Sequence, residues 1–312
     1  MSLLSSPPQS RHRYVAVLKG GPGAEREVSL RSGAAVAEAL RSQGLRVEEL
    51  DVHDVTFQIP EQVEAVFPVL HGSFGEDGIA QRRLEELGFP YVGSRSWEMP
   101  RSFDKEIARA LLAQAGIPVA DGVMVEAGEQ VPLSAPLVIK APRQGSSIGL
   151  EIVMEPDQVP ESLEKVRAFD ERVLVETFVK GKEVTVGFLG NQALPVIEIR
   201  PASGTYDFQA KYERTDTEYL CPAPLDADMA NRVTAIARRA FHQLGGRHFG
   251  RVDLRIPEEG DPVVLELNPI PGFTATSLLP KAAAAFGIDF PSLCVLILNQ
   301  AEKTSTYGEI KT

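Results

Sequence analysis

Residues 249–268, FGRVDLRIPEEGDPVVLELN, predict two antiparallel strands, 249–256 and 262–268, joined by a turn-rich loop. Alternation along the strands places apolar side chains on one face: Val252, Leu254 and Ile256 on the first strand, Leu265 and Leu267 on the second. The other face carries charged and polar side chains: Arg251, Asp253, Arg255, Glu266 and Asn268. We therefore expect a hairpin with one face in the core and the other at a ligand site or in solvent.

Three side chains on the polar face of this hairpin carry oxygen atoms that suit a hard cation. Asp253, Glu266 and Asn268 supply carboxylate and amide oxygens, the ligands that Mg²⁺ prefers alongside water and phosphate oxygens. An ordinary half-solvated hairpin explains the same pattern, because charged residues on exposed sheet faces are common. Other parts of the chain have to decide between these interpretations.

Two lysines precede the hairpin in settings that suit phosphate binding. Lys140 ends an apolar strand at 136–141, just before the small-residue loop 145–149, and Lys105 opens a helix that Asp104 can cap. An ammonium group beside free backbone N–H groups can hold a phosphate, although a single lysine is more often a solvated surface residue. The chain contains no GxxxxGK[ST] loop, and Gly20–Gly23 does not form GxGxxG, which argues against a P-loop NTPase and a simple NAD-dependent dehydrogenase.

The first third of the chain alternates strands with helices. We expect strands at 14–19, 46–51, 63–70 and 90–92, and helices at 30–43 and 78–87. This alternation is typical of a parallel sheet covered by helices. His71 opens a Gly- and acid-rich loop at a strand end, where such sheets bind ligands, and Glu25 lies between the first loop and its helix, where a carboxylate is also favoured as a simple capping charge.

The middle of the chain indicates antiparallel pairing. We expect strands at 136–141 and 172–177 and a hairpin of 182–189 with 192–200 around Gly190-Asn191. The polar, turn-rich stretch 203–219 is long enough to act as a mobile lid. A helix at 227–244 and helices from about 277 and 291 complete the predicted elements.

Composition excludes several classes of protein. The 312 residues carry a formal charge of −11 and no Lys/Arg cluster, so nucleic acid is not an expected partner. The longest apolar stretches fall far short of the roughly 18 residues that span a bilayer, and we expect no membrane association. Residues 1–13 contain no apolar core typical of a signal sequence, so we interpret them as a flexible tail on a cytoplasmic protein. Two cysteines without ligand spacing argue against a disulfide framework.

Taken together and in this order, the segments resemble the D-alanine–D-alanine ligase family of the ATP-grasp superfamily. The residues that carry the resemblance are GGPGAEREVSL (20–30), HGSFGEDG (71–78), DK (104–105), Lys140 with GSSIG (145–149), YDFQAKY (206–212), GRVD (250–253) and 266–277. Each motif is weak by itself, but seven in register are specific. The resemblance covers about residues 14–298.

The resemblance implies a fold that mixes α/β and α+β parts: an ATP-grasp fold with an N-terminal Rossmann-like domain built on a parallel sheet. It implies an N-terminal domain at 14–104, a central ATP-grasp domain at 105–190, and a C-terminal ATP-grasp domain at 191–312 that carries the lid 203–219. Chain length alone suggests about two domains. The resemblance raises that number to three.

The resemblance also implies an activity. ATP would phosphorylate the carboxylate of one D-alanine, and the amine of a second would attack the acyl phosphate, giving D-alanyl-D-alanine for peptidoglycan precursor synthesis. The cofactors would be ATP and two Mg²⁺ ions, with Mn²⁺ as a substitute, and a homodimer is an assembly common in the family. Two alternatives remain open: an ATP-grasp ligase that joins other amino acids, and a non-catalytic nucleotide-binding module.

Site roles follow from the positions of residues in the family motifs. The resemblance assigns nucleotide binding to Lys105, Lys140, Ser147, Glu176, Phe178, Val179, Glu183 and Lys211, and metal binding to Asp253, Glu266 and Asn268. It assigns the amino-acid substrates to Glu25, His71, Ser277 and Leu278, and the catalytic set to Glu25, Ser146, Tyr212, Arg251 and Gly272. Within this set, Glu25, Ser146 and Tyr212 would form a hydrogen-bonded group that closes the lid. Arg251 and the N–H of Gly272 would form the oxyanion site.

Overall fold

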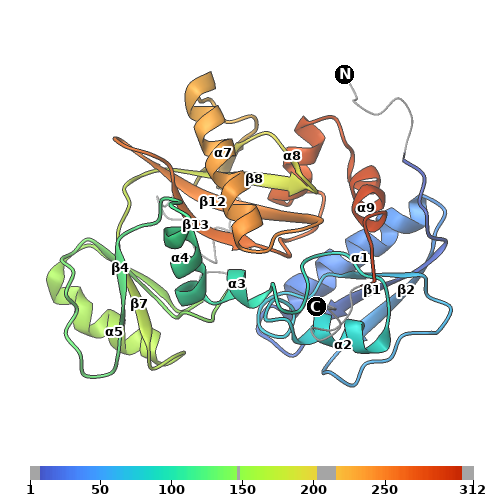
Figure 1. Ribbon diagram of the computed structural model, residues 1–312, viewed down its shortest axis with the longest axis horizontal. Helices are drawn as coiled ribbons and strands as arrows, with labels where there is room; N and C mark the ends of the chain where they lie inside the picture. The colour runs from blue at the N-terminus through green and yellow to red at the C-terminus, as the bar shows by residue number, and fades with distance from the viewer. Residues whose placement is uncertain (1–7, 146–147, 202–215, 304–312) are drawn as a thin grey trace, which may run out of the picture.

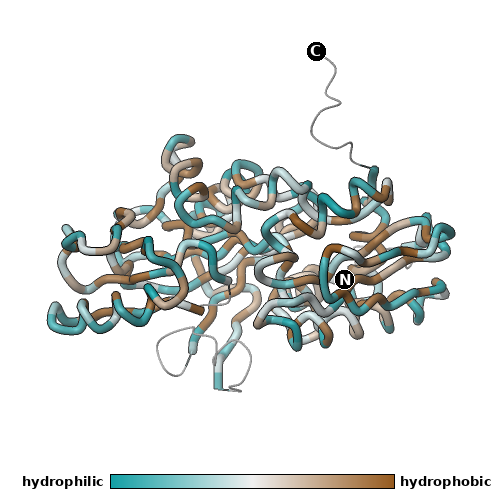
Figure 2. The backbone as a smooth tube through the Cα atoms, turned by 90° about the horizontal axis from the view of Figure 1, so that it is seen from below, coloured by the Kyte–Doolittle hydropathy of each residue, from teal (hydrophilic) through white to brown (hydrophobic). Residues whose placement is uncertain are grey.

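The computed structural model describes residues 8–145, 148–201 and 216–303, and these residues form three β-sheets (Figure 1). The N-terminal sheet and the small central sheet lie at opposite ends of the molecule, and the C-terminal sheet lies between and above them in that view. Hydrophobic segments lie mainly inside the molecule, and many segments at its periphery are hydrophilic (Figure 2). The combination of a parallel sheet with antiparallel sheets confirms the predicted fold class.

The N-terminal sheet consists of parallel strands in the order β2-β1-β3, with bounds β1 Tyr14–Gly20, β2 Arg46–Val52 and β3 Ala65–Pro68. Helix α1 (Arg26–Ser42) packs Val36 and Leu40 into the same apolar cluster as Val15 and Val17 of β1. Helix α2 (Ile79–Leu87) buries Leu84 in a second cluster with Leu18, and ends at Gly88. The sheet is thus covered by helices, as the alternation predicts.

The central sheet is antiparallel, in the order β4-β7-β5-β6. Its strands are β4 Gly122–Val125, β5 Leu137–Lys140, β6 Leu150–Val153 and β7 Val173–Thr177, and its helices are the 3₁₀ turn η1 Pro156–Gln158 and α5 Val159–Arg167. Two helices, α3 (Pro100–Phe103) and α4 (Lys105–Gln114), lead into this sheet. The Asp104 carboxylate caps α4 by accepting hydrogen bonds from the backbone N–H groups of Glu106 and Ile107, so Lys105 begins the helix as predicted.

The C-terminal sheet has the order β11-β10-β8-β12-β13, with β9 paired to β8. Its strands are β8 Gly181–Leu189, β9 Gln192–Ala193, β10 Ile197–Arg200, β11 Glu218–Leu220, β12 Phe249–Pro257 and β13 Val263–Asn268. Helix α7 (Ala227–Gln243) shares an apolar cluster with Val186 and Leu254, whereas α8 (Leu278–Ala285) packs near Gly187 of β8, where an added Cβ would lie 2.7 Å from the Leu279 side chain. Helix α9 (Phe290–Leu298) then returns to the N-terminal sheet and contacts α1.

Three predicted boundaries differ from the observed elements. The expected domain boundary at residue 190 follows β8, yet β8 pairs with β10 and β12 of the C-terminal sheet. The predicted lid 203–219 ends inside β11, which pairs with β10, and residues 203–215 lie outside the described residues. In the predicted tail, the backbone N–H groups of Arg11 and Arg13 donate to the side chains of Asn299 and Glu64, so this part is fastened to the fold. Each difference arises from a pairing between distant residues.

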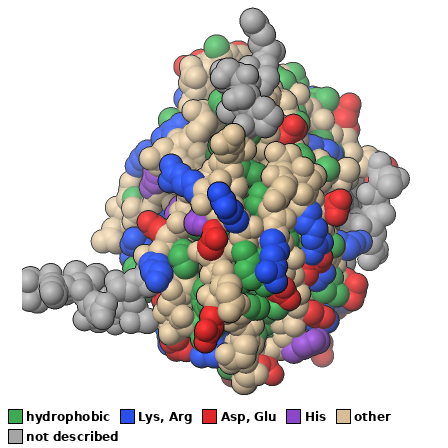
Figure 3. All heavy atoms as spheres, turned by 90° about the vertical axis from the view of Figure 1, so that its right-hand side faces the viewer, with side chains coloured by type: hydrophobic (Ala, Val, Ile, Leu, Met, Phe, Trp, Pro, Cys, Tyr) green, Lys and Arg blue, Asp and Glu red, His purple; other side chains and the backbone are tan. Residues whose placement is uncertain are grey.

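Among the described residues, no single helix is long and apolar enough to cross a membrane. Helices α8 and α9 taken together reach the required length and composition, with a bend of 103° between them. Both helices bury apolar side chains in the core that they share with the N-terminal sheet. On the face seen in Figure 3, basic and acidic side chains are interspersed.

A polar seam joins the N-terminal sheet to the C-terminal sheet. The N–H of Gly93 donates to Nδ1 of His248 over 3.1 Å, and the Ser94 hydroxyl donates to the Gly245 carbonyl over 2.7 Å. His248 is 8% exposed, and its burial, reinforced by the cations Arg247 and Arg95, lowers its pKa from 6.5 to about 4. The folded protein therefore holds this imidazole neutral, with Nδ1 acting as an acceptor across the seam.

We expect His248→Asn to make the protein less sensitive to acid. The unfolded chain protonates His248 near pH 6.5 and the folded chain only near pH 4, so wild-type stability falls as the pH drops through this window, by about 3 kcal/mol in all. An asparagine can still accept the Gly93 hydrogen bond but does not titrate. Urea unfolding of both proteins at pH 7, 6, 5 and 4 measures the difference. An equal loss of stability in both proteins would contradict this role of His248.

Candidate active site

Two cavities meet at the polar face of the β12–β13 hairpin. The larger, about 390 Å³, is lined by the N-terminal sheet's loops, the C-terminal sheet and the start of α8. The smaller, about 110 Å³, lies between the central and C-terminal sheets. Lys105, Gln144 and Glu266 line both cavities. A group bound in one cavity is therefore close to a group bound in the other.

The smaller cavity combines apolar walls with charged ends. Strand β5 contributes Val138 and Lys140, and β6 contributes Ile152. The segment between β7 and β8 contributes Phe178 and Val179. Apart from Lys105, the remaining charged lining residues come from β7, β8, β12 and β13: Glu176, Glu183, Asp253, Arg255 and Glu266. A flat apolar group with a polar extension suits this lining.

Glu176 is the buried centre of an ion-pair network in the smaller cavity. Its carboxylate lies 2.5 Å from Nζ of Lys140 and 2.6 Å from Nη1 of Arg109. Arg109 also donates to the carbonyls of Ala120 and Gly122. Burial by itself would raise the pKa of the Glu176 carboxyl, but the two cations, Lys140 first, outweigh burial and leave the pKa lowered. Glu176 is therefore ionised at neutral pH and fixes the direction of Lys140.

A β-bulge changes which side chains of the hairpin face the site. Val252 pairs with Leu267 and Asp253 with Glu266, but Leu254 then pairs with Val264, so the register shifts and Leu265 is passed over. Val264 joins the apolar cluster beneath the sheet, whereas Leu265 lines the smaller cavity beside Glu266. The prediction that Leu265 lies on the core face with Leu267 is therefore wrong. Strict alternation fails here because a bulge inserts one extra residue into the strand.

The oxygen-bearing residues of the hairpin differ in how they are satisfied. Asp253 is 4% exposed, and its carboxylate accepts hydrogen bonds from Arg251, Thr185 and Asn268. The side chain of Glu266 has no hydrogen-bond or ion-pair partner within the part of the chain that the structure describes, and it borders both cavities. The donor set at this edge is oxygen, which fits Mg²⁺. Within the same described residues, no group of three or more His, Cys, Asp or Glu side chains gathers for a softer metal.

The larger cavity contains a buried carboxylate at the start of α1. Glu25 occupies the N-cap position of that helix and is 6% exposed. Gly72, with φ of +70°, passes so close that an added Cβ would lie 2.4 Å from a Glu25 carboxylate oxygen. Gly145 approaches the same oxygen, and a Cβ there would lie 3.0 Å away. Both glycines therefore let the backbone close around Glu25, as close approach requires.

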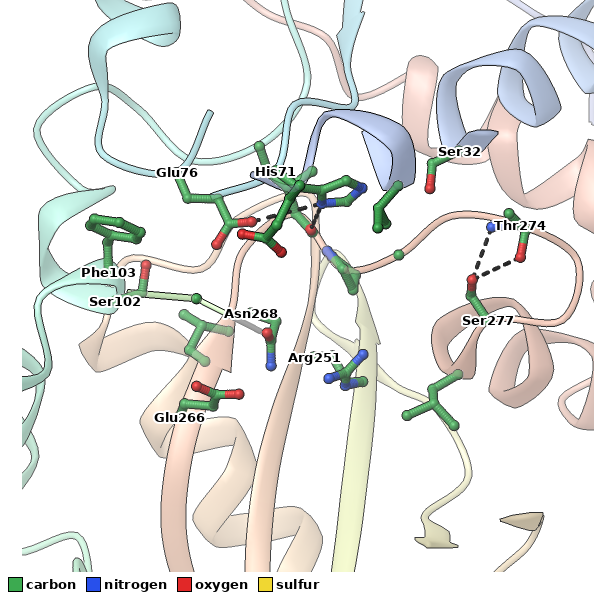
Figure 4. A pocket seen from close by; sticks show the side chains of 18 of the residues that line it. Ser32, His71, Glu76, Ser102, Phe103, Arg251, Glu266, Asn268, Thr274 and Ser277 are labelled. Carbon is green, nitrogen blue, oxygen red and sulfur yellow. Dashed lines mark hydrogen bonds and ion pairs between the residues drawn. The ribbon is translucent and has the colours of Figure 1, made fainter. Parts of the chain in front are cut away.

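His71 is oriented by the chain segment that follows the hairpin. Its Nδ1 lies 2.9 Å from the carbonyl oxygen of Ile270, and because a carbonyl only accepts, Nδ1 carries a proton and donates. Its Nε2 is buried and has no partner among the described residues. Figure 4 shows His71 and Glu76 above the side chains of Arg251, Glu266 and Asn268, which rise from the two strands. The cavity thus has His71 and Glu76 on one side, and the guanidinium of Arg251 beside the carboxylate of Glu266 on the other.

The far wall of the larger cavity is the turn into α8. Ser277 occupies the N-cap position of α8, and its hydroxyl accepts a hydrogen bond from the N–H of Thr274 over 3.0 Å. Gly272 and Leu278 line the same wall. In Figure 4 Ser277 and Thr274 lie across the cavity from Glu266. A helix N-terminus at this position favours an anionic group.

Comparison with known proteins identifies the family. A sequence model described as the D-ala D-ala ligase C-terminus matches residues 111–299, and one described as the D-ala D-ala ligase N-terminus matches residues 48–94. The D-alanine–D-alanine ligase of Methylacidiphilum infernorum is 45% identical over 286 residues, which is 92% of this chain and 94% of that protein. The chain belongs to the D-alanine–D-alanine ligase family.

Solved structures of D-alanine–D-alanine ligases share the ATP-grasp fold of this family member. The D-alanine–D-alanine ligase from Bacillus anthracis, in a crystal structure with ATP, superimposes with a TM-score of 0.81 at 29% identity, covering 91% of this chain and 96% of that one. The VanG D-Ala:D-Ser ligase from Enterococcus faecalis superimposes with a TM-score of 0.80 at 28% identity, covering 93% and 99%. The predicted family and the predicted ATP-grasp fold are confirmed.

The two cavities bring together every predicted site residue of this ligase that the structure describes. The larger cavity is lined by Glu25, His71, Lys105, Arg251, Glu266, Asn268, Gly272, Ser277 and Leu278. The smaller is lined by Lys105, Lys140, Glu176, Phe178, Val179, Glu183, Asp253 and Glu266. Ser146, Ser147, Lys211 and Tyr212 lie outside the described residues. Their predicted roles stay predictions.

Sequence reasoning missed several residues that line the cavities or build them. Gln144 lines both cavities, and its carbonyl oxygen accepts a hydrogen bond from Nζ of Lys105 over 2.5 Å. Arg109, on α4, holds Glu176 from outside the sheet. The sequence signal for Gln144 is its position directly before the Gly-rich loop. Arg109 offered none, because its partner is 67 residues away.

We expect Glu176→Gln to lower the free energy of unfolding by about 3 kcal/mol, because it leaves the buried charges of Lys140 and Arg109 without a counterion. Urea unfolding at pH 7 without nucleotide measures the loss. Glu161→Gln is the matched control: Glu161 pairs with Lys165 on an exposed helix surface, where such pairs contribute little to stability. Equal effects of the two substitutions would show that the Glu176 network does not stabilise the fold.

Proposed function

We propose that this chain joins two D-alanine molecules into D-alanyl-D-alanine at the expense of ATP. A carboxylate oxygen of the first D-alanine attacks the γ-phosphorus, ADP leaves, and the amine nitrogen of the second D-alanine attacks the acyl-phosphate carbon. Phosphate then leaves and the amine loses its proton. The observation that carries this proposal is the meeting of two cavities at Lys105, Gln144 and Glu266 in a member of this ligase family.

ATP occupies the smaller cavity in this proposal. The apolar walls hold adenine, with its amino group toward Glu176 and the backbone of Phe178 and Val179, and Glu183 receives the ribose. Lys105 and Lys140 face the phosphates, together with Ser147 and Lys211 from outside the described residues. Phosphoryl transfer requires positioning and charge neutralisation more than covalent help from the protein, and the two lysines would supply part of the positive charge.

Asp253, Glu266 and Asn268 are the residues that would hold two Mg²⁺ ions, with Mn²⁺ as a substitute. The donor atoms are oxygens, as these cations require, and Glu266 has no partner among the described residues. A divalent ion neutralises phosphate charge and polarises the phosphoryl oxygen when it is bound. Arg251 holds Asp253 through both carboxylate oxygens and so fixes its direction.

The amino acids occupy the larger cavity. Glu25 carries a negative charge for the ammonium group of the first D-alanine, and Nε2 of His71 supports it as an acceptor. Arg251 and the N–H of Gly272 face the oxygen that becomes negative in the tetrahedral intermediate. Ser277 and Leu278 at the start of α8 receive the carboxylate of the second D-alanine.

The predicted lid completes this proposal. Glu25, Ser146 and Tyr212 would form a hydrogen-bonded group when the stretch 203–219 closes, and closure would keep water from the acyl phosphate. The three domains, a homodimer and a cytoplasmic location are further parts of the proposal. The small-molecule partners are D-alanine and ATP, with neither nucleic acid nor membrane involved.

The decisive test is turnover with single D-amino acids. We expect purified protein with ATP and Mg²⁺ to form ADP only when D-alanine is added, and mass spectrometry to identify the dipeptide. D-Serine is the informative competitor, because a matched structure is named a D-Ala:D-Ser ligase. Products from other amino acids in place of D-alanyl-D-alanine would support a ligase of different specificity. ATP binding without turnover on any of them would support a non-catalytic module.

We expect Glu266→Gln to leave the protein folded and to reduce turnover at least about a hundredfold. The reason is that a neutral amide cannot offset the charge of a Mg²⁺ ion bound where the two cavities meet. ADP release with D-alanine measures the loss, and circular dichroism checks the fold. Glu259→Gln, in the exposed loop of the same hairpin, is the matched control and should keep wild-type turnover. Near-normal turnover of the Glu266 variant would count against the metal assignment.

A further inference from the structure

Arg255 borders the smaller cavity, and neither the family motifs nor the proposed function gives it a role. It lies on β12 directly opposite Glu183 on β8, in the register of the antiparallel pair. Directly opposed residues on one face of a sheet are close enough for their side chains to interact. The side chains of Arg255 and Glu183 are each 13% exposed, so this contact is largely screened from solvent.

One guanidinium group contacts three parts of the nucleoside end of the cavity. Nη2 of Arg255 lies 2.8 Å from a carboxylate oxygen of Glu183. Nη1 donates to the backbone carbonyl of Val179 over 3.3 Å. The guanidinium carbon lies 5.3 Å from the centre of the Phe178 ring. All three partners line the cavity, and two of them belong to the segment that connects the central sheet to the C-terminal sheet.

These contacts need the particular chemistry of arginine. A planar guanidinium can donate to two acceptors at once and also lie against an aromatic ring, whereas a lysine ammonium acts as a point charge. A half-buried glutamate has several rotamers, and an ion pair selects one of them before a ligand arrives. Fixing a binding group in advance lowers the entropy lost on binding.

We propose that Arg255 is a positioning residue for the nucleoside half of ATP. It holds the Glu183 carboxylate in place to receive a ribose hydroxyl, and it fixes the Val179 carbonyl and the Phe178 ring beside the adenine. This inference rests on the proposed binding of ATP in the smaller cavity. Arg255 itself contacts neither phosphate nor amino acid in this proposal, so it acts on ATP affinity and leaves the chemical step unchanged.

The test compares nucleotides that differ only in the ribose. Arg255→Met, Arg255→Lys, Glu183→Gln and the double variant Arg255→Met/Glu183→Gln are titrated with ATP, 2′-deoxy-ATP and 3′-deoxy-ATP in the presence of Mg²⁺. Calorimetry gives Kd, and ADP release with D-alanine gives KM and kcat. We expect Arg255→Met to weaken ATP binding roughly tenfold, the size expected for a lost charge-assisted contact, with kcat changed less than about twofold.

The ribose dependence separates positioning from a merely structural ion pair. For the deoxy-nucleotide that lacks the hydroxyl bound by Glu183, the Arg255→Met penalty should fall below about threefold, and the double variant should bind ATP about as weakly as Glu183→Gln alone. Arg255→Lys keeps the charge but loses the planar guanidinium that donates to two acceptors, so it should weaken ATP binding by about threefold. The KM for D-alanine should not change in any of these variants.

Arg232→Met is the matched control, because Arg232 forms ion pairs with Asp228 and Asp261 at the exposed surface of the same sheet's helix α7. It should bind all three nucleotides like the wild type. An equal penalty for all three nucleotides with Arg255→Met, additive effects in the double variant, or a loss of kcat at unchanged KM would overturn the positioning role. A wild-type protein that binds ATP without D-alanine turnover would instead overturn the proposed ligation, and the binding arm would still decide the role of Arg255.

Discussion

The polar face of the β12–β13 hairpin is the constraint on which the site depends. Antiparallel pairing puts Asp253 next to Glu266, and two carboxylates so close repel each other unless positive charge is near. Arg251 meets this requirement for Asp253 with two hydrogen bonds. Glu266 has no such partner among the described residues and faces both cavities. The hairpin therefore folds with one of its charges left for a ligand to balance.

The packing around the hairpin keeps this arrangement rigid. On the other face of the sheet, Val252 and Leu254 join the apolar cluster that includes Phe241 of α7, and stacking of Phe188 on Phe241 joins β8 to the same helix. Because β12 and the neighbouring strand β8 are both anchored in this core, a shift of the carboxylates would disturb close-packed side chains. Rigid strands hold functional groups more accurately than loops do. The loops that approach Glu25 therefore pack over a rigid part of the C-terminal sheet.

Local patterns predicted most elements, and distant pairings account for what they missed. The hairpin, the Asp104 cap and the parallel N-terminal sheet follow from alternation, capping chemistry and strand–helix order, which are local signals. The bulge at Leu265 does not, because strict alternation holds only in a regular strand. The ion pair of Arg109 with Glu176 and the hydrogen bond of Arg11 to Asn299 join residues far apart in the chain. The resemblance to the family motifs identified the cavity residues, because the motifs mark segments that are far apart in the chain and lie together in the fold.

Charge balance in the smaller cavity explains why a nucleotide should arrive with a cation. In the described part of the chain, two of the three basic side chains that line this cavity already face a protein carboxylate: Lys140 faces Glu176, and Arg255 faces Glu183. Lys105 donates to the carbonyl of Gln144 at the junction of the two cavities. A triphosphate would add several negative charges beside Glu266, in a setting where burial strengthens repulsion. Binding is therefore favourable only if further positive charge comes with the phosphates, and the oxygen ligands at the hairpin edge are of the kind that hold a divalent ion.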